Sequence, residues 1–70
     1  MKITILYENL IFVGLKDKRV EFYYHDDCFI ICWFETQEEA TIIFDICTPS
    51  VANTGNGNIK VKDYKIMTWR

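Results

Sequence analysis

The chain contains little proline or glycine, with one and three of them respectively among its 70 residues. This scarcity excludes collagen-like and low-complexity sequences, in which these residues are abundant. No apolar run approaches the roughly 18 residues that a membrane-spanning helix requires. The first residues also lack the pattern of a secretion signal. We therefore expect residues 1–70 to form a single small domain that acts in the cytoplasm and does not contact a membrane.

The sequence also has few residues suited to metal binding or catalysis. Its cysteines are Cys28, Cys32 and Cys47, an odd number that indicates free thiols in a reducing compartment. His25 would complete a set of four zinc ligands. However, Cys28 and Cys32 would lie about 13 Å apart on an extended strand, which is too far for one ion. We expect no metal site, no cofactor and no enzymatic activity, because so short a chain leaves little volume for a substrate cavity of roughly 300 Å³.

Half of the residues are apolar and 16% are aromatic, and many of them lie in short alternating segments. Alternation of apolar and polar side chains over four to eight residues is typical of half-buried β-strands. The predicted strands are Lys2–Tyr7, Leu10–Leu15, Arg19–Tyr24, Cys28–Phe34, Ala40–Ile46, Ile59–Lys62 and Lys65–Trp69. Asn56-Gly57 is the sharpest turn signal, within a predicted loop at Cys47–Asn58. Cys28–Phe34 is apolar on both faces, so we expect a central strand with Trp33 in the core.

The segment Ala40–Ile46 fits two kinds of structure. Its period of two and its β-branched run Thr41-Ile42-Ile43 favour a strand. Thr36 and Glu39, in contrast, have the spacing of a helix capping box, and apolar residues at helical spacing follow them. We favour the strand. The sequence then predicts an all-β fold: a small antiparallel sheet, sandwich or barrel of five to seven short strands. The alternative is an α+β fold with one short helix near residues 37–46.

The charges are separated along the chain. From Val20 to Ile59 there are seven acidic residues and no Lys or Arg. Most of these acids lie in two predicted turns, which a meander would place at opposite ends of Cys28–Phe34. They could form acidic surfaces that attract a basic partner. Alternatively, they pair with basic strands across the sheet or are simply solvated, and turn acids of that kind contribute little to stability.

Two tyrosines next to the first acidic turn are candidates for partner contact, because tyrosine is enriched among residues that dominate binding energy. Tyr23 lies on the polar face of its predicted strand, and Tyr24 adjoins the turn. The complete set of candidate partner-binding residues is Tyr23, Tyr24, Asp26, Asp27, Glu35, Glu38 and Glu39.

These features favour a protein-binding module that is not an enzyme, an inhibitor or adaptor that presents an acidic surface to a basic partner. In size and acidic character the chain resembles small inhibitors encoded by phages and other mobile elements, including anti-CRISPR proteins. That resemblance implies inhibition of a host nucleic-acid-binding complex in the host cytoplasm. The alternative function is a small β-barrel that binds single-stranded nucleic acid through its basic, aromatic C-terminal strands. A further alternative is a homo-oligomer. The residues of the nucleic-acid alternative are Lys60, Lys62, Tyr64, Lys65, Trp69 and Arg70.

Overall fold

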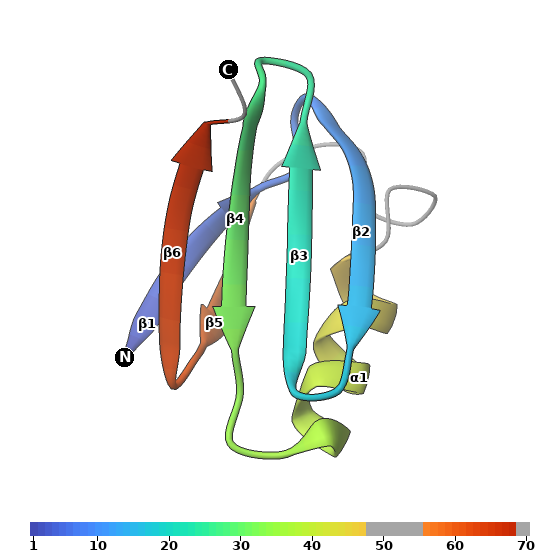
Figure 1. Ribbon diagram of the computed structural model, residues 1–70, viewed down its shortest axis with the longest axis vertical. Coiled ribbons are helices and arrows are strands. Elements are labelled where there is room, and N and C mark those ends of the chain that lie inside the picture. The colour runs from blue at the N-terminus through green and yellow to red at the C-terminus, as the bar shows by residue number, and fades with distance from the viewer. Residues whose placement is uncertain (48–55, 69–70) are drawn as a thin grey trace.

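A computed structural model describes residues 1–47 and 56–68, which form two antiparallel sheets and one helix (Figure 1). Four strands form the larger sheet in the order β2-β3-β4-β6, and β1 pairs with β5 in a two-stranded ribbon. The mostly β, antiparallel fold predicted from the sequence is confirmed. The elements are β1 (Lys2–Leu6), β2 (Leu10–Lys16), β3 (Arg19–Tyr24), β4 (Cys28–Trp33), α1 (Gln37–Cys47), β5 (Asn56–Lys60) and β6 (Asp63–Thr68).

Tight turns join the first four strands, and each turn contains one residue in the left-handed backbone region. These residues are Asn9, Asp17 and Asp27, with φ values of 67°, 54° and 64°. Asn and Asp tolerate this region better than other non-glycine residues. The polar residues between the apolar segments therefore fix a meander in which β3 lies between β2 and β4.

Residues 37–47 form a helix, so the predicted strand at Ala40–Ile46 is wrong and the alternative is correct. The capping box decides the outcome. The Glu39 amide donates a hydrogen bond to Thr36 Oγ1 at 3.1 Å, and that hydroxyl donates to Glu39 Oε1 at 3.2 Å. The helix packs against β2 and β3 and buries Ala40 and Cys47. Local capping together with this burial outweighs the strand preference of the β-branched run.

The predicted turn at Asn56-Gly57 is also wrong, because both residues belong to β5. Gly57 pairs with Ile5 of β1, and Tyr7 crosses close above it. A Cβ atom at position 57 would overlap the Tyr7 hydroxyl, so a larger residue there would require the end of the Tyr7 side chain to shift. The rest of the predicted loop, residues 48–55, lies outside the described residues.

The larger sheet has two different faces. Its core face packs against α1 and the ribbon, and Val13, Val20 and Phe22 are buried there. Its opposite face, here called the open face, looks toward the viewer in Figure 1, with α1, β1 and β5 behind the sheet. Trp33 pairs with Arg19 on the open face and is only half-buried. The expectation that Trp33 is a core residue is therefore wrong, although β4 is a central strand as predicted.

Candidate functional site

The two predicted contact tyrosines lie on opposite faces of β3. Tyr23 is half-buried on the open face, beside Phe29. Tyr24 belongs to the core, with 8% of its surface exposed. The structure therefore separates these two residues, and only Tyr23 can contribute to a contact across the open face.

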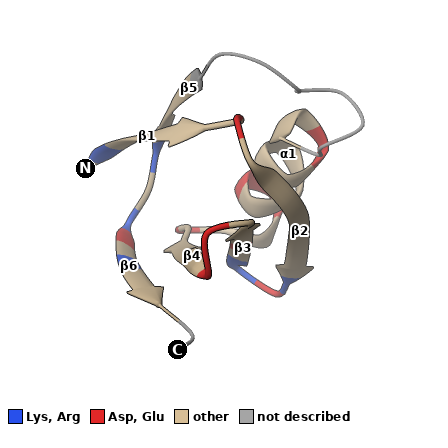
Figure 2. Cartoon of the chain, turned by 90° about the horizontal axis from the view of Figure 1, so that it is seen from above, with Lys and Arg blue, Asp and Glu red and all other residues tan. Residues whose placement is uncertain are grey.

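The predicted acidic residues form two groups at opposite ends of the molecule. Asp26 and Asp27 lie in the turn between β3 and β4. Glu35, Glu38 and Glu39 lie beyond the other end of β4 and in the first turn of α1 (Figure 1). Figure 2 colours the acidic residues red. The six residues of β4 separate the groups by about 20 Å. The acids therefore do not form one continuous surface.

The acidic residues of α1 have a structural role of their own. Glu39 completes the capping box with Thr36, and Glu38 shares the first turn of the helix. Negative charge in this position is favourable, because the helix N-terminus carries a partial positive charge. Helix capping therefore explains the position of Glu38 and Glu39 without a binding partner.

The basic C-terminal residues do not share one face with the tyrosine predicted beside them. Lys65 lies on the open face opposite Ile31, whereas its neighbour Tyr64 pairs with Cys32 on the other side of the sheet. Lys60 ends β5, and Lys62 lies in the corner between β5 and β6. Trp69 and Arg70 fall outside the described residues.

The open face carries a group of residues of which the sequence identifies only Tyr23 as a candidate contact. Three aromatic rings and one methionine lie side by side across all four strands of the larger sheet. Phe12 is 57% exposed and Met67 is 36% exposed. This aromatic row consists of Phe12, Tyr23, Phe29 and Met67.

The rings of the aromatic row hold one another in fixed orientations. The Tyr23 and Phe29 rings are stacked, with centroids 5.3 Å apart and an angle of 14° between their planes. Phe12 meets Tyr23 at 5.7 Å with a tilt of 52°. Stacking covers one face of the Tyr23 ring and one face of the Phe29 ring.

A half-buried ion pair anchors the middle of the row. The Tyr23 hydroxyl donates a hydrogen bond to Glu21 Oε1 at 2.8 Å, and Arg19 Nε lies 2.8 Å from Glu21 Oε2. The hydrogen bond to Glu21, with burial adding to it, raises the pKa of Tyr23 above its ordinary value of 10. The hydroxyl therefore remains a protonated donor, and Glu21 is held in place from two sides.

Charges of both signs border the aromatic row on the open face. The next row of the sheet pairs Glu21 with Ile31 and Ile31 with Lys65. In the row beyond it, Arg19 pairs with Trp33, and Trp33 pairs with Asp63. The open face therefore combines an apolar centre with a mixed polar border.

The chain matches no protein-family model, no curated protein and no solved structure. Its site therefore has to be judged from its own geometry. Within residues 1–47 and 56–68, no three His, Cys, Asp or Glu side chains are grouped as metal ligands. In the same part of the chain, no helix is long and apolar enough to cross a membrane.

Proposed function

We propose that this chain is a protein-binding module, an inhibitor or adaptor, whose contact surface is the open face of the larger sheet. The aromatic row is the observation that carries the proposal. Phe, Tyr, Trp, Met and Arg are enriched at the centres of protein interfaces, and all five residue types occur on this face. A rigid row also loses little conformational freedom on binding, which favours affinity.

The ring geometry favours a protein partner over single-stranded nucleic acid. Bases bind by stacking on free aromatic faces within a basic groove. Here the stacked Tyr23 and Phe29 each cover one face of the other ring, and the Tyr23 hydroxyl is bonded to the Glu21 carboxylate. Arg19, a basic residue on the same face, already pairs with Glu21. An apolar protein surface can contact the aromatic row without needing free ring faces or a basic groove.

The proposed partner surface is apolar at its centre and basic at one border. The turn that holds Asp26 and Asp27 is residues 25–27. It begins two residues after Tyr23 and ends two residues before Phe29, so it lies beside the aromatic row. Its carboxylates would attract a basic border and increase the association rate. A small acidic inhibitor of a basic host complex in a cytoplasm fits this description, and the free thiols Cys28, Cys32 and Cys47 fit a reducing compartment.

The proposal is tested by cross-linking and affinity capture in the cells that produce the chain. The double variant Phe12→Ser with Met67→Ser removes the two exposed ends of the aromatic row. We expect it to weaken binding of the captured protein at least tenfold, about 1.4 kcal/mol. Ile42→Ser is the matched control, because Ile42 is 52% exposed but lies on α1. Equal binding by the double variant and the wild type would contradict the proposal.

A titration with single-stranded DNA and RNA tests the nucleic-acid alternative on the same variants. We expect no binding by the wild type in the micromolar range at physiological salt. Micromolar binding that weakens as salt is raised, and that is lost in the Phe12→Ser, Met67→Ser protein, would instead assign the open face to nucleic acid.

A further inference from the structure

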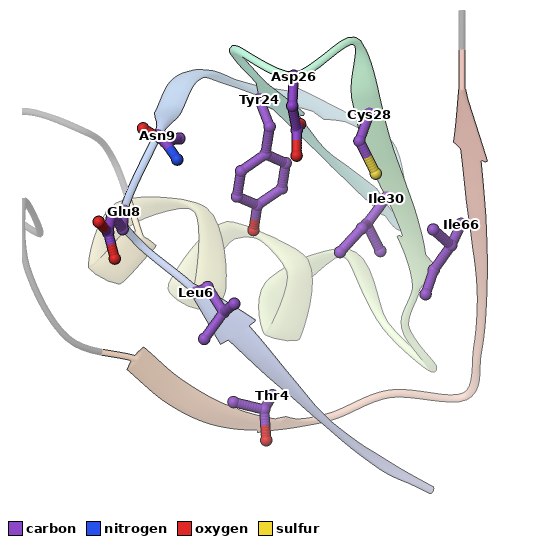
Figure 3. A pocket seen from close by; sticks show the side chains of 9 residues that line it. All are labelled: Thr4, Leu6, Glu8, Asn9, Tyr24, Asp26, Cys28, Ile30 and Ile66. Atoms are coloured by element: carbon purple, nitrogen blue, oxygen red, sulfur yellow. The ribbon is translucent and has the colours of Figure 1, made fainter.

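The core face of the larger sheet has a hollow at the side that α1 does not cover. It lies between the β1–β5 ribbon and strands β4 and β6 (Figure 3). Its volume is about 290 Å³, close to the lower limit of about 300 Å³ for small-molecule sites. The ribbon stands away from the sheet on this side, which leaves the hollow open.

Apolar side chains from three strands line the body of this hollow. Leu6 comes from β1, Ile30 from β4 and Ile66 from β6. Leu6 is 58% exposed and Ile66 is 60% exposed, although both face the interior space. Covering these side chains with an apolar ligand would be favourable, because it removes apolar surface from water.

Acidic side chains lie at one end of the hollow. Glu8 comes from the turn between β1 and β2, and Asp26 comes from the turn between β3 and β4 (Figure 3). Among the described residues that line the hollow, none is Lys or Arg. The potential at this end is therefore negative, and a cation is favoured there over an anion.

Tyr24 is a second, independent indication of a ligand. Its ring lines the hollow and points into it (Figure 3). Only 8% of the residue is exposed, and its hydroxyl has no hydrogen-bond partner within residues 1–47 and 56–68. Buried polar groups nearly always have a partner, so an orphaned hydroxyl beside a hollow marks a place where a polar ligand group is favourable.

We propose that this hollow binds a small organic amine. The ammonium group lies beside the Asp26 carboxylate, at the end of the hollow that Glu8 also borders, and the apolar body packs against Leu6, Ile30 and Ile66. The site is on the opposite side of the larger sheet from the aromatic row, so it adds an activity to the proposed protein contact. Binding of an amine there leaves the aromatic row free.

Titration of the labelled protein by NMR, with three probes that share one apolar body, tests the proposal. The probes are phenethylammonium, the neutral 2-phenylethanol and the anionic 3-phenylpropionate. We expect phenethylammonium to bind with a Kd of about 1 mM or tighter and at least tenfold more tightly than 3-phenylpropionate. Shift changes should be confined to amides near the hollow. Equal binding of the cation and the anion, or shifts on the open face, would overturn the proposal.

Pairs of neighbouring residues provide matched variants. Asp26→Asn should weaken phenethylammonium binding at least fivefold and leave 2-phenylethanol binding unchanged, whereas Asp27→Asn, in the same turn but outside the lining, should change neither. Ile66→Ser should weaken binding of both probes, whereas Met67→Ser, on the open face, should weaken neither. If the two variants of either pair change probe binding equally, the proposed site is wrong. If Ile66→Ser unfolds the domain, the Asp26 and Asp27 pair still decides the outcome.

Discussion

The Tyr24 hydroxyl is a buried polar group without a partner within residues 1–47 and 56–68. Burial raises its pKa to about 12, with smaller contributions from nearby thiols and Asp26. An unsatisfied hydroxyl of this kind costs about 1–3 kcal/mol. We expect Tyr24→Phe to leave the free energy of unfolding unchanged or to raise it by about 1 kcal/mol, as measured by urea unfolding. Tyr23→Phe removes the hydrogen bond to Glu21 and should lower the free energy of unfolding by about 1 kcal/mol. A larger loss of unfolding free energy for Tyr24→Phe than for Tyr23→Phe would show that the Tyr24 hydroxyl has a partner.

Cys32 should make stability depend on pH in the alkaline range. Burial, with a contribution from Cys47, raises the pKa of the Cys32 thiol from 9.0 to about 12. The unfolded chain therefore loses this proton first, and rising pH favours unfolding. The contribution of the protonated Cys32 thiol to the free energy of unfolding is complete below about pH 9 and is lost between pH 9 and 12. Urea unfolding from pH 8 to 11 should show a falling free energy, with a shallower slope in Cys32→Ala. An unchanged slope in that variant would count against the assignment.

At the scale of the element, α1 depends on its first turn. Thr36 accepts a hydrogen bond from the Glu39 amide, and loss of such a cap costs about 1 kcal/mol. We expect Thr36→Ala to lower the melting temperature by roughly 4–8 °C, and Thr36→Ser to retain most of the stability. Reversal of both acids, Glu38→Lys with Glu39→Lys, should also lower it, contrary to the expectation that these acids contribute little. Thermal unfolding followed by circular dichroism at 222 nm measures each effect, and an unchanged midpoint for Thr36→Ala would exclude the capping role.

The alternation of apolar and polar residues within single segments predicts most strands. It does not predict which residues of neighbouring strands lie opposite one another. Arg19–Tyr24 has the predicted alternation, and its burial follows it residue by residue. Phe12 shows what the pattern lacks. An irregularity in pairing between Leu10 and Phe12 places Leu10 opposite Tyr24 on the core face and Phe12 opposite Tyr23 on the open face. Simple alternation places these two residues on one face, so the aromatic row could not be derived without the register.

The helix was missed for a different reason. The residues that decide it, Thr36 and Glu39, lie at its start, outside the segment whose alternation favoured a strand. Asn56-Gly57 likewise has the sequence pattern of a turn. In the structure Gly57 lies within β5, where it is close to Tyr7, fifty positions earlier in the chain. Both errors come from contacts that a local pattern does not contain.

At the scale of the whole molecule, the two sheets should differ in their resistance to opening. Within the described residues, β3 and β4 are each paired on both sides, whereas β1 and β5 pair only with each other. Local opening of a two-stranded ribbon breaks fewer contacts than opening of a central strand. Native-state hydrogen exchange should therefore be slowest in β3 and β4 and faster in β1 and β5. Equal protection of all six strands would indicate that the domain opens only as a single unit.

The pairing of β1 with β5 also imposes an order on synthesis. Thr4 lies opposite Asn58, 54 positions later in the chain. Ribosomes add roughly 5–20 residues per second, so about 3–11 s pass between the synthesis of β1 and that of its partner strand. During this interval the hairpins of β2, β3 and β4 can form, while Ile3 and Ile5 have no strand to pair with. A nascent-chain chaperone that recognises short apolar segments therefore has several seconds in which β1 is its natural substrate.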